Sequence, residues 1–328
     1  MSGLDPQLSI ADNYRAWGRD ARGRSPAYEM LSCSVAEDDL ILKFLAALPE
    51  PKQQPNLLFA AATYLLGIAP GLAELRTLVR RDPAGLTRVM LARRTQTNEA
   101  ARCATLLPVL AGLPEPLALI EVGASAGLTL LADRYSYDYE GHRISGTDPD
   151  APVIRCAVSG PVPLPDRVPV ICWRAGLDLN PLDVADDDDM RWLSCLLWPG
   201  EAGRAERLAG AIASARRDPP VIHRGDLLTD LPGLAAQAPP EATLVVYHSA
   251  VLAYVAPADR ERFAATVRGL GAVWLSNEAP GVVSGVPSEE RDDGGCLVVR
   301  DGRTLLALAD GHGTWLQWLA AGGGWARR

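Results

Sequence analysis

The sequence predicts an α/β protein in which a doubly wound, mostly parallel sheet follows an all-helical N-terminal region. Residues 1–115 carry only helical patterns of apolar residues, whereas residues 116–328 alternate short apolar runs with helical patterns. Alternating strands and helices fold into a parallel sheet with helices on both faces. We therefore expect two domains, a helical cap over 1–115 and a sheet domain over 116–328.

The first region predicts helices over 34–49, 55–69, 73–81 and 97–113. Ser34 and Glu37 form a capping-box pattern at the start of the first of them. Pro70 and the glycine after it are expected to end the second, and Pro108 is expected to kink the last. No strand is predicted before residue 116.

The second region predicts strands over 117–123, 168–179, 220–226, 242–255 and 271–278. Each is a short apolar run of the kind that forms a buried parallel strand. Helices are expected over 124–135, 187–198, 201–217 and 257–270, and an inserted hairpin with loops over 135–168. Two apolar runs joined through Asp301 and Gly302 predict a terminal hairpin.

Composition and charge limit the classes of partner. The chain is 48% hydrophobic and 22% charged, with a net charge of −8. The negative net charge argues against a nucleic-acid partner, since neutralising phosphates needs clustered Lys and Arg.

The longest apolar run, 57–69, is shorter than the roughly 20 residues that a bilayer needs. With no export signal at the N-terminus, we expect a cytoplasmic protein with no membrane partner.

The sequence predicts neither a metal site nor disulfides. Its six cysteines include no C-x-x-C pair, and its four histidines show no metal-ligand spacing. Zinc sites need such clusters, and scattered cysteines are typical of reduced thiols in the cytosol. No feature of the sequence indicates an oligomeric state.

The stretch 120–128, IEVGASAGL, has two incompatible interpretations. As G-x-S-x-G it is the nucleophile elbow of a serine hydrolase, in which Ser125 attacks an acyl group. Asp226 with His248 or His312 would complete the triad. As a glycine-rich turn it brings the backbone close to a nucleotide. In an α/β-hydrolase the elbow follows several earlier strands of the sheet, but Ser125 follows the first, which favours the nucleotide.

A nucleoside would lie beyond the carboxyl ends of the strands. The expected cofactor-binding residues are Glu121, Gly123, Ala124, Ser125, Gly127, Asp178, Asp226, Leu227 and His248. Asp178 can accept from both ribose hydroxyls, a role for which Asp183 competes. Asp226 can accept from the adenine amino group while Leu227 packs on the ring. NAD is disfavoured because Ser125 stands where G-x-G-x-x-G has its second glycine.

Five strings of the sequence resemble one widespread bacterial family of unknown function, whose core is similar to the class I S-adenosyl-L-methionine (SAM) methyltransferases. They are IEVGASAGL, QPNLLFAA (54–61), QTNEAARC (96–103), GLDLNPLDV (176–184) and RWLSCLLWP (191–199). Five parallel strands and a hairpin whose last strand runs antiparallel to the others is the order of that core. The resemblance implies SAM as cofactor and methyl transfer to a small-molecule substrate. Cleavage or cyclisation of SAM itself and non-catalytic nucleoside binding are the alternatives.

The catalytic candidates are His248, Ser249 and Tyr14. His248 and Ser249 end the fourth strand, where an imidazole could deprotonate the nucleophile of the substrate. His248 could equally be a core histidine. Tyr14 is one of the aromatic residues near the N-terminus that could face the SAM sulfonium. The alternative role of these aromatic residues is packing.

Overall fold

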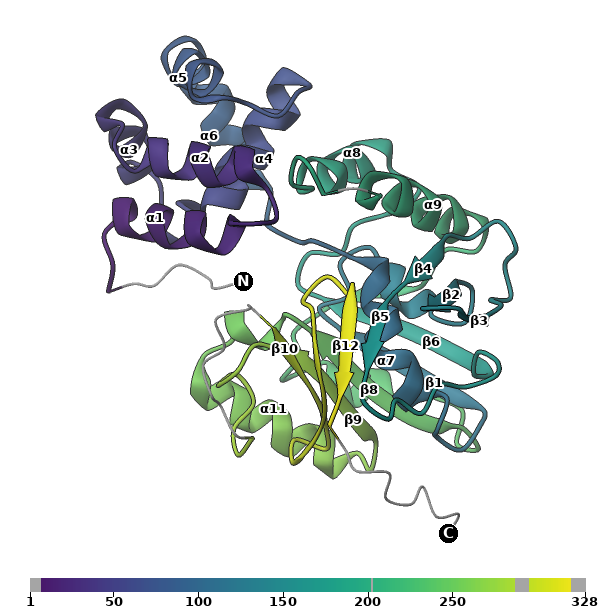
Figure 1. Cartoon of the computed structure of the whole chain (residues 1–328). Coiled ribbons are helices and arrows are strands. Elements are labelled where there is room, and N and C mark those ends of the chain that lie inside the picture. The colour runs from purple at the N-terminus through teal and green to yellow at the C-terminus, as the bar shows by residue number, and fades with distance from the viewer. Residues whose placement is uncertain (1–6, 202, 287–294, 320–328) are drawn as a thin grey trace. The chain divides into compact units, whose positions relative to one another are not determined.

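The computed structural model describes residues 7–201, 203–286 and 295–319. The chain forms two compact units, 1–97 with 186–205, and 98–185 with 206–328 (Figure 1). This division differs in two places from the boundary expected at residue 116. Residues 98–115 group with the sheet, and residues 186–205 group with the N-terminal helices.

The described residues of the first unit form helices joined by turns and loops, and they contain no strand. Its helices are α1 (Ile10–Ala21), α2 (Pro26–Val35), α3 (Asp39–Ala46), α4 (Pro55–Leu66), α5 (Leu72–Arg81), α6 (Pro83–Ala92) and α8 (Asp187–Cys195), with the short 3₁₀ helix η1 (Glu50–Lys52). The capping box expected at Ser34 is wrong, because Ser34 lies in the last turn of α2 and Asp38 caps α3. Gly67, in the left-handed conformation, ends α4 before Pro70 is reached, as glycine commonly does.

Side-chain contacts hold α8 against the N-terminal helices. The Arg93 guanidinium pairs with Asp188 and, at 2.6 Å, with Asp189. The Trp192 indole donates to the carbonyl of Arg94 (2.9 Å). Because Arg93 is only 20% exposed at its side chain, these ion pairs are screened less than surface pairs. They explain why a segment from the middle of the chain groups with the first unit.

The second unit contains a nine-stranded sheet in the order β5-β12-β11-β10-β9-β8-β1-β6-β7. Its strands are β1 (Leu117–Val122), β5 (Ala157–Ser159), β6 (Ile171–Asp178), β7 (Ile222–Arg224), β8 (Thr243–Ser249), β9 (Val273–Glu278), β10 (Cys296–Arg300), β11 (Thr304–Ala309) and β12 (Trp315–Trp318). The five strands predicted from apolar runs are β1, β6, β7, β8 and β9, and they pair in parallel. The α/β class is therefore confirmed.

The other end of the sheet is antiparallel. β10 and β11 form the hairpin predicted through Asp301 and Gly302, but β10 already runs antiparallel to β9. The resemblance implied that only the last strand would do so. Parallel neighbours need a long crossover, usually a helix, and the described residues between β9 and β10, 279–286 and 295, contain none.

The helix expected over 124–135 is wrong. The segment forms only a 3₁₀ turn, η3 (Leu128–Leu131). The Tyr135 hydroxyl donates to the carbonyl of Leu128 (2.6 Å) and the Tyr137 hydroxyl to that of Ala132 (2.5 Å). These bonds take carbonyls that a continuing helix would use. A three-stranded sheet of β2 (Ser136–Tyr139), β3 (His142–Ile144) and β4 (Val153–Arg155) follows, including the predicted hairpin.

Helices cover both faces of the large sheet (Figure 1). On one face, apolar side chains of β1, β8 and β9 pack with α10 (Leu231–Ala235) and α11 (Pro257–Gly269). On the other, the Asn277 amide of β9 donates to the Thr105 hydroxyl of α7 (Cys103–Leu110) at 3.2 Å. The remaining elements are α9 (Arg204–Arg217) and the 3₁₀ turns η2 (Ala100–Arg102) and η4 (Leu252–Tyr254).

Candidate functional site

The strand order places a switch point between β1 and β8. The chain leaves β1 towards β6 on one side and leaves β8 towards β9 on the other. The loops that follow the two strands therefore diverge, and ligands of open α/β sheets bind in the crevice that this leaves. The candidate site consists of these loops and the polar side chains beneath them.

The glycine-rich loop is held by hydrogen bonds from two of its backbone amides. The Gly123 amide donates to the carbonyl of Leu177 (2.8 Å). The Ser125 amide donates to the Asp178 carboxylate (2.8 Å). The loop also departs from ordinary backbone, with φ of 72° at Gly123, 53° at Ser125 and 71° at Gly127. Such angles favour glycine, which explains two of the three residues.

The space beside both glycines is filled by this chain. A Cβ on Gly123 would lie 2.4 Å from a methyl of Val251, and one on Gly127 would lie 2.7 Å from Pro220. Val251 follows β8, so its contact with Gly123 joins the two loops at the switch point. The glycines are thus explained by the turn and its packing, without a ligand against them. Ala124, between them, is fully buried.

We expect Gly123→Ala to lower the free energy of unfolding by about 2–4 kcal/mol, because it combines a left-handed backbone with an overpacked methyl. Urea unfolding measures the loss. In Gly271→Ala, where φ is +66° and nothing lies within 4 Å, the loss should be about 1 kcal/mol. Adding Val251→Ala to Gly123→Ala should recover part of the stability. Equal losses in the two glycine variants would contradict the clash.

The two carboxylates predicted to bind the nucleoside accept hydrogen bonds from backbone amides of the loops around them. Asp178 accepts from the Ser125 amide and from the Asn180 amide (2.7 Å). Asp226 accepts from the Leu228 amide (2.7 Å). A carboxylate oxygen has more than one lone pair, so these bonds leave acceptor capacity. Of the two acids considered for the ribose, Asp178 is the one that contacts the glycine-rich loop.

His248 is a core histidine. It is fully buried, and the Trp274 indole donates to its Nε2 (2.9 Å). Since an indole N–H can only donate, Nε2 accepts, and Nδ1 donates to Glu278 (2.7 Å). Both ring nitrogens are engaged, so neither can take a proton from a substrate. Phe263 of α11 packs on the ring at 5.6 Å between centroids. We do not retain His248 as a base.

The other two catalytic candidates lie in different surroundings. Tyr14 is fully buried in the helical unit, where it packs edge-on against Phe59. This is the packing alternative, and it leaves no ring face for a sulfonium. Ser249 is 8% exposed, and its carbonyl accepts from the Arg102 guanidinium (3.1 Å). Leu227 is half-buried in the loop after β7.

A row of polar side chains lies beneath the loops, on the α7 face of the sheet. Glu121 pairs with Tyr247 in the β1–β8 register, and Ser249 pairs with Asn277 in the β8–β9 register. Glu121, Tyr247 and Asn277 are at most 3% exposed. Glu121 Oε2, the Tyr247 hydroxyl and Asn277 Oδ1 have no hydrogen-bond partner in the described structure. Buried polar atoms without a partner are rare in folded proteins, so these three call for an explanation.

Burial raises the pKa of Glu121 to about 8, although a hydrogen bond from Thr129 and the charge of Arg102 oppose the effect. The Thr129 hydroxyl donates to Oε1 of this carboxyl. At neutral pH the group is therefore mostly protonated. A protonated carboxyl offers a donor as well as acceptors.

The sequence reasoning missed the segment that encloses this row. Asn98 accepts from the Leu128 amide (2.7 Å) and so fixes the end of the glycine-rich loop. Glu99 pairs with Arg207 (2.7 Å), and Arg102 donates to the carbonyls of Ser249 and Gly311. The signal was present, because five of the eight residues of QTNEAARC are polar and the helical pattern that follows them is apolar.

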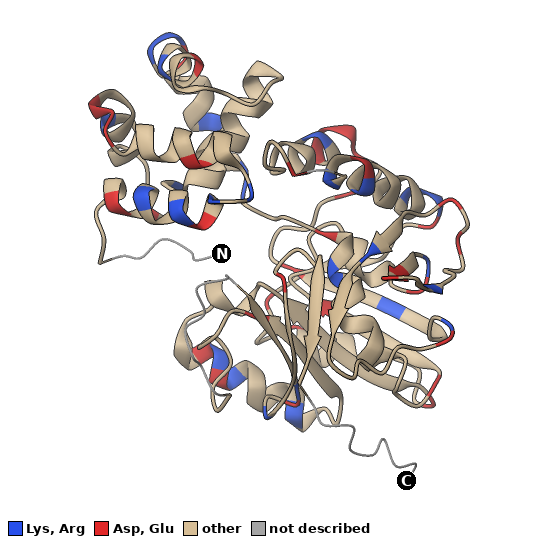
Figure 2. Cartoon of the chain, viewed as in Figure 1, with Lys and Arg blue, Asp and Glu red and all other residues tan. Residues whose placement is uncertain are grey.

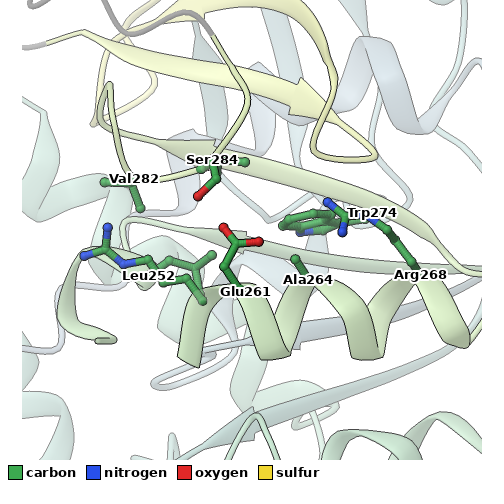
Figure 3. A pocket seen from close by; sticks show the side chains of 9 residues that line it. Leu252, Glu261, Ala264, Arg268, Trp274, Val282 and Ser284 are labelled. Carbon is green, nitrogen blue, oxygen red and sulfur yellow. The ribbon is translucent and has the colours of Figure 1, made fainter. Parts of the chain in front are cut away.

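A pocket on the opposite face is too small for a nucleoside. Its volume is about 10 Å³, the room of roughly one water molecule. Leu252, Trp274 and α11 line it, and Figure 3 shows Glu261 pointing towards Ser284. The Arg268 guanidinium lies over the Trp274 ring at 5.7 Å. We assign no ligand to this pocket.

A family model described as "Uncharacterized protein conserved in bacteria (DUF2332)" matches residues 11–318. The chain belongs to this family. The resemblance to an uncharacterised bacterial family is thus confirmed. No curated protein and no solved structure matches the chain. The function of this member of the family must therefore be inferred from its own residues.

The hydrolase triad is not assembled around Ser125, which is 4% exposed. The Asp226 carboxylate is bonded to a backbone amide, and the His248 ring to Glu278 and Trp274. Neither residue is hydrogen-bonded to Ser125 in the part of the chain that is described. His312, the other candidate base, lies between β11 and β12. The structure therefore does not favour acyl transfer.

Two further expectations concern partners. Within the described ranges, no helix is long and apolar enough to span a membrane, and no group of three or more His, Cys, Asp or Glu could hold a metal ion. Both acidic and basic side chains occur on α9 and on α11 (Figure 2). That this member of the family does not bind nucleic acid stays a prediction.

Proposed function

We propose that this protein is a SAM-dependent transferase that methylates a small molecule at the switch point between β1 and β8. The observation that carries the proposal is the order of the parallel strands. β1 has β6 and β7 on one side and β8 and β9 on the other, which is the arrangement that binds nucleotides at the carboxyl edge of doubly wound sheets. The class I methyltransferase core shares this order of five parallel strands.

The residues at the edge fit a nucleoside that carries an amino-acid group. Asp178 is half-buried where β6 ends, and Leu179 after it is 58% exposed. A carboxylate beside an exposed apolar side chain can hold a ribose and contact a base. The buried Glu121 Oε2 and Tyr247 hydroxyl, which lack partners in the described structure, supply polar contacts at the next pair of strands.

The chain contributes positioning in this proposal. Bound SAM would supply an electrophilic methyl group, and the loops after β1 and β8 would hold it near the substrate nucleophile. Holding reactants in near-attack geometry can contribute about 7–11 kcal/mol to lowering a barrier. Since His248 cannot act as a base, no side chain is assigned to proton removal.

Isothermal titration calorimetry with SAM and with S-adenosylhomocysteine tests the proposal. We expect both to bind wild type in the micromolar range. Asp178→Asn should lower the affinity for both ligands roughly tenfold, as expected for loss of one charge-assisted hydrogen bond. The matched control is Asp183→Asn, because Asp183 is exposed and accepts from the Ala185 amide. The control should bind as wild type does.

Failure of folded wild-type protein to bind either ligand would overturn the proposal. Equal weakening in Asp178→Asn and Asp183→Asn would contradict the assignment of Asp178 to the ribose. If both ligands bind, screening of acceptors with methyl-labelled SAM comes next. Consumption of SAM without an acceptor would favour cleavage or cyclisation over methyl transfer.

A further inference from the structure

Arg102 differs from the other buried arginines of this chain. In five others the side chain is at most 20% exposed and pairs with a carboxylate: Arg93, Arg134, Arg174, Arg204 and Arg207. Arg102 is 5% exposed, and in the described ranges it has no ion-pair partner. A buried charge is costly unless it is paired, so the lack of an anion calls for an explanation.

The geometry shows where the guanidinium lies. Nη1 donates to the carbonyl of Ser249, the last residue of β8 (3.1 Å), and Nε donates to the carbonyl of Gly311 (2.9 Å). Both acceptors are neutral. The guanidinium is therefore fixed at the carboxyl end of β8, beside the switch point, and its charge is not balanced by the groups that hold it.

The neighbouring polar side chains also have unused capacity. Asn277 lies opposite Ser249 in the β8–β9 register. Its Nδ2 donates to Thr105, whose own hydroxyl donates to the Arg102 carbonyl (2.8 Å). These two successive hydrogen bonds fix Nδ2 of Asn277 as the donor. Its Oδ1 is therefore a buried acceptor, and it has no partner in the described structure. The Tyr247 hydroxyl on the same face also has no hydrogen-bond partner in the described structure, but it lies close enough to Glu121 to lower the pKa of that carboxyl.

Glu121 does not neutralise the arginine at neutral pH. Burial keeps its pKa near 8, even though the charge of Arg102 lowers it. The other ionisable groups facing Glu121 are Asp178 on β6, Cys103 on α7, and Tyr135 and Tyr247. Burial holds the pKa of the Cys103 thiol and of both phenols well above their usual values. Glu121, the Cys103 thiol and both phenols therefore carry no negative charge at neutral pH. The buried carboxylates of Glu99 and Asp310, near the contacts of Arg102, are held by Arg207 and by His312 and Thr314, and neither forms an ion pair with Arg102 in the described structure.

We infer that Arg102 anchors the carboxylate of a small-molecule ligand, with the Tyr247 hydroxyl and Asn277 Oδ1 as the polar contacts beside it. A carboxylate supplies the missing negative charge and matches the planar guanidinium. Asn277 Oδ1 would accept from a donor on the ligand, such as an amine or a hydroxyl. The carboxylate could come from the amino-acid group of SAM or from the substrate. Only the first source rests on the proposed function.

The carboxylate site is tested without SAM by ¹⁹F NMR of trifluoroacetate, with ionic strength held constant by sodium chloride. Wild type should give saturable, protein-dependent line broadening. Arg102→Met should lose it by at least roughly tenfold, as expected for removing a charged hydrogen-bond donor. Arg102→Lys, which keeps the charge, should retain part of it. Equal titration of wild type and Arg102→Met would overturn the inference.

The matched control is Arg260→Met. Arg260 also donates to two backbone carbonyls, those of Val255 (2.8 Å) and Ala253 (3.3 Å), but lies on α11 at the opposite face. It reports the loss of guanidinium–backbone bonds alone, and it should titrate trifluoroacetate as wild type does. Equal loss in the two arginine variants would assign Arg102 a purely structural role.

Titration with S-adenosylhomocysteine and 5′-methylthioadenosine distinguishes the sources. If SAM supplies the carboxylate, Arg102→Met should lower the affinity for S-adenosylhomocysteine roughly tenfold to hundredfold. The affinity for methylthioadenosine, which has no carboxylate, should stay unchanged. If the substrate supplies it, both affinities should persist, and trifluoroacetate should still bind the S-adenosylhomocysteine complex. Equal weakening of the two nucleosides would contradict the inference. Failure of wild type to bind either nucleoside would overturn the proposed function and leave the trifluoroacetate result standing.

Discussion

Glu278→Ala is expected to lower the free energy of unfolding by about 3–5 kcal/mol, as removing one partner of a buried polar pair does. Glu278 is 1% exposed, and its Oε1 accepts from His248 Nδ1 and from the amides of Val251 and Leu252. One carboxylate oxygen thus holds both the core histidine and the loop after β8. The variant would leave all three donors buried without this acceptor.

Urea unfolding at pH 7 measures the loss, and Ser276→Ala is its matched control. Ser276 lies on the same strand and face, is 1% exposed, and its hydroxyl has no partner in the described structure. The control should change stability by less than about 1 kcal/mol. A loss in Glu278→Ala no larger than that of the control would show that the carboxylate does not hold the loop.

The pH dependence of this contribution has a definite sign. Burial raises the pKa of Glu278, but the hydrogen bonds from His248, Val251 and Leu252 lower it below its usual value of 4.5. A group whose pKa is lower in the folded state stabilises it above the unfolded pKa. The contribution of Glu278 should therefore be present above pH 4.5 and be lost as the pH falls through the folded pKa.

The strands of the sheet were predictable because their signal is local. Buried parallel strands are continuous apolar runs, and β1 and β8 have that pattern. The helix expected after β1 failed for a reason outside its own sequence. Its carbonyls accept from tyrosines that follow it, Tyr135 and Tyr137, and periodicity alone cannot show such partners. Likewise, nothing within the strings around 186–205 indicates that they group with the N-terminal helices.

The candidate site was predictable in its position and less so in its groups. The residues that end the strands were found, because carboxyl ends of parallel strands share one edge. The environment of His248 depends on Trp274 and Glu278, which are 26 and 30 positions further along the chain. Arg102 precedes the sheet and resembles a solvated arginine of a helix. Its burial follows only from the tertiary contacts with Ser249 and Gly311.

Glu121→Gln is expected to remove a dependence of stability on pH that amounts to about 5 kcal/mol. The pKa of Glu121 rises from its usual value of 4.5 to about 8 because of burial. The stabilisation from this protonated carboxyl is fully present below pH 4.5 and is lost as the pH rises through 8. Gln keeps an acceptor for the Thr129 hydroxyl and cannot ionise, so its variant serves as the reference.

Urea unfolding of both proteins from pH 4.5 to 9 measures this difference. As the pH rises, the free energy of unfolding of wild type should fall by about 4–5 kcal/mol relative to that of Glu121→Gln, most of it between pH 5 and 8. A constant difference would mean that Glu121 is ionised in the folded protein. Arg102, the cation whose charge acts on Glu121, would then have a counter-charge within its own chain. The physical reason for a ligand carboxylate at Arg102 would disappear with it, so this result bears on the site as well as on stability.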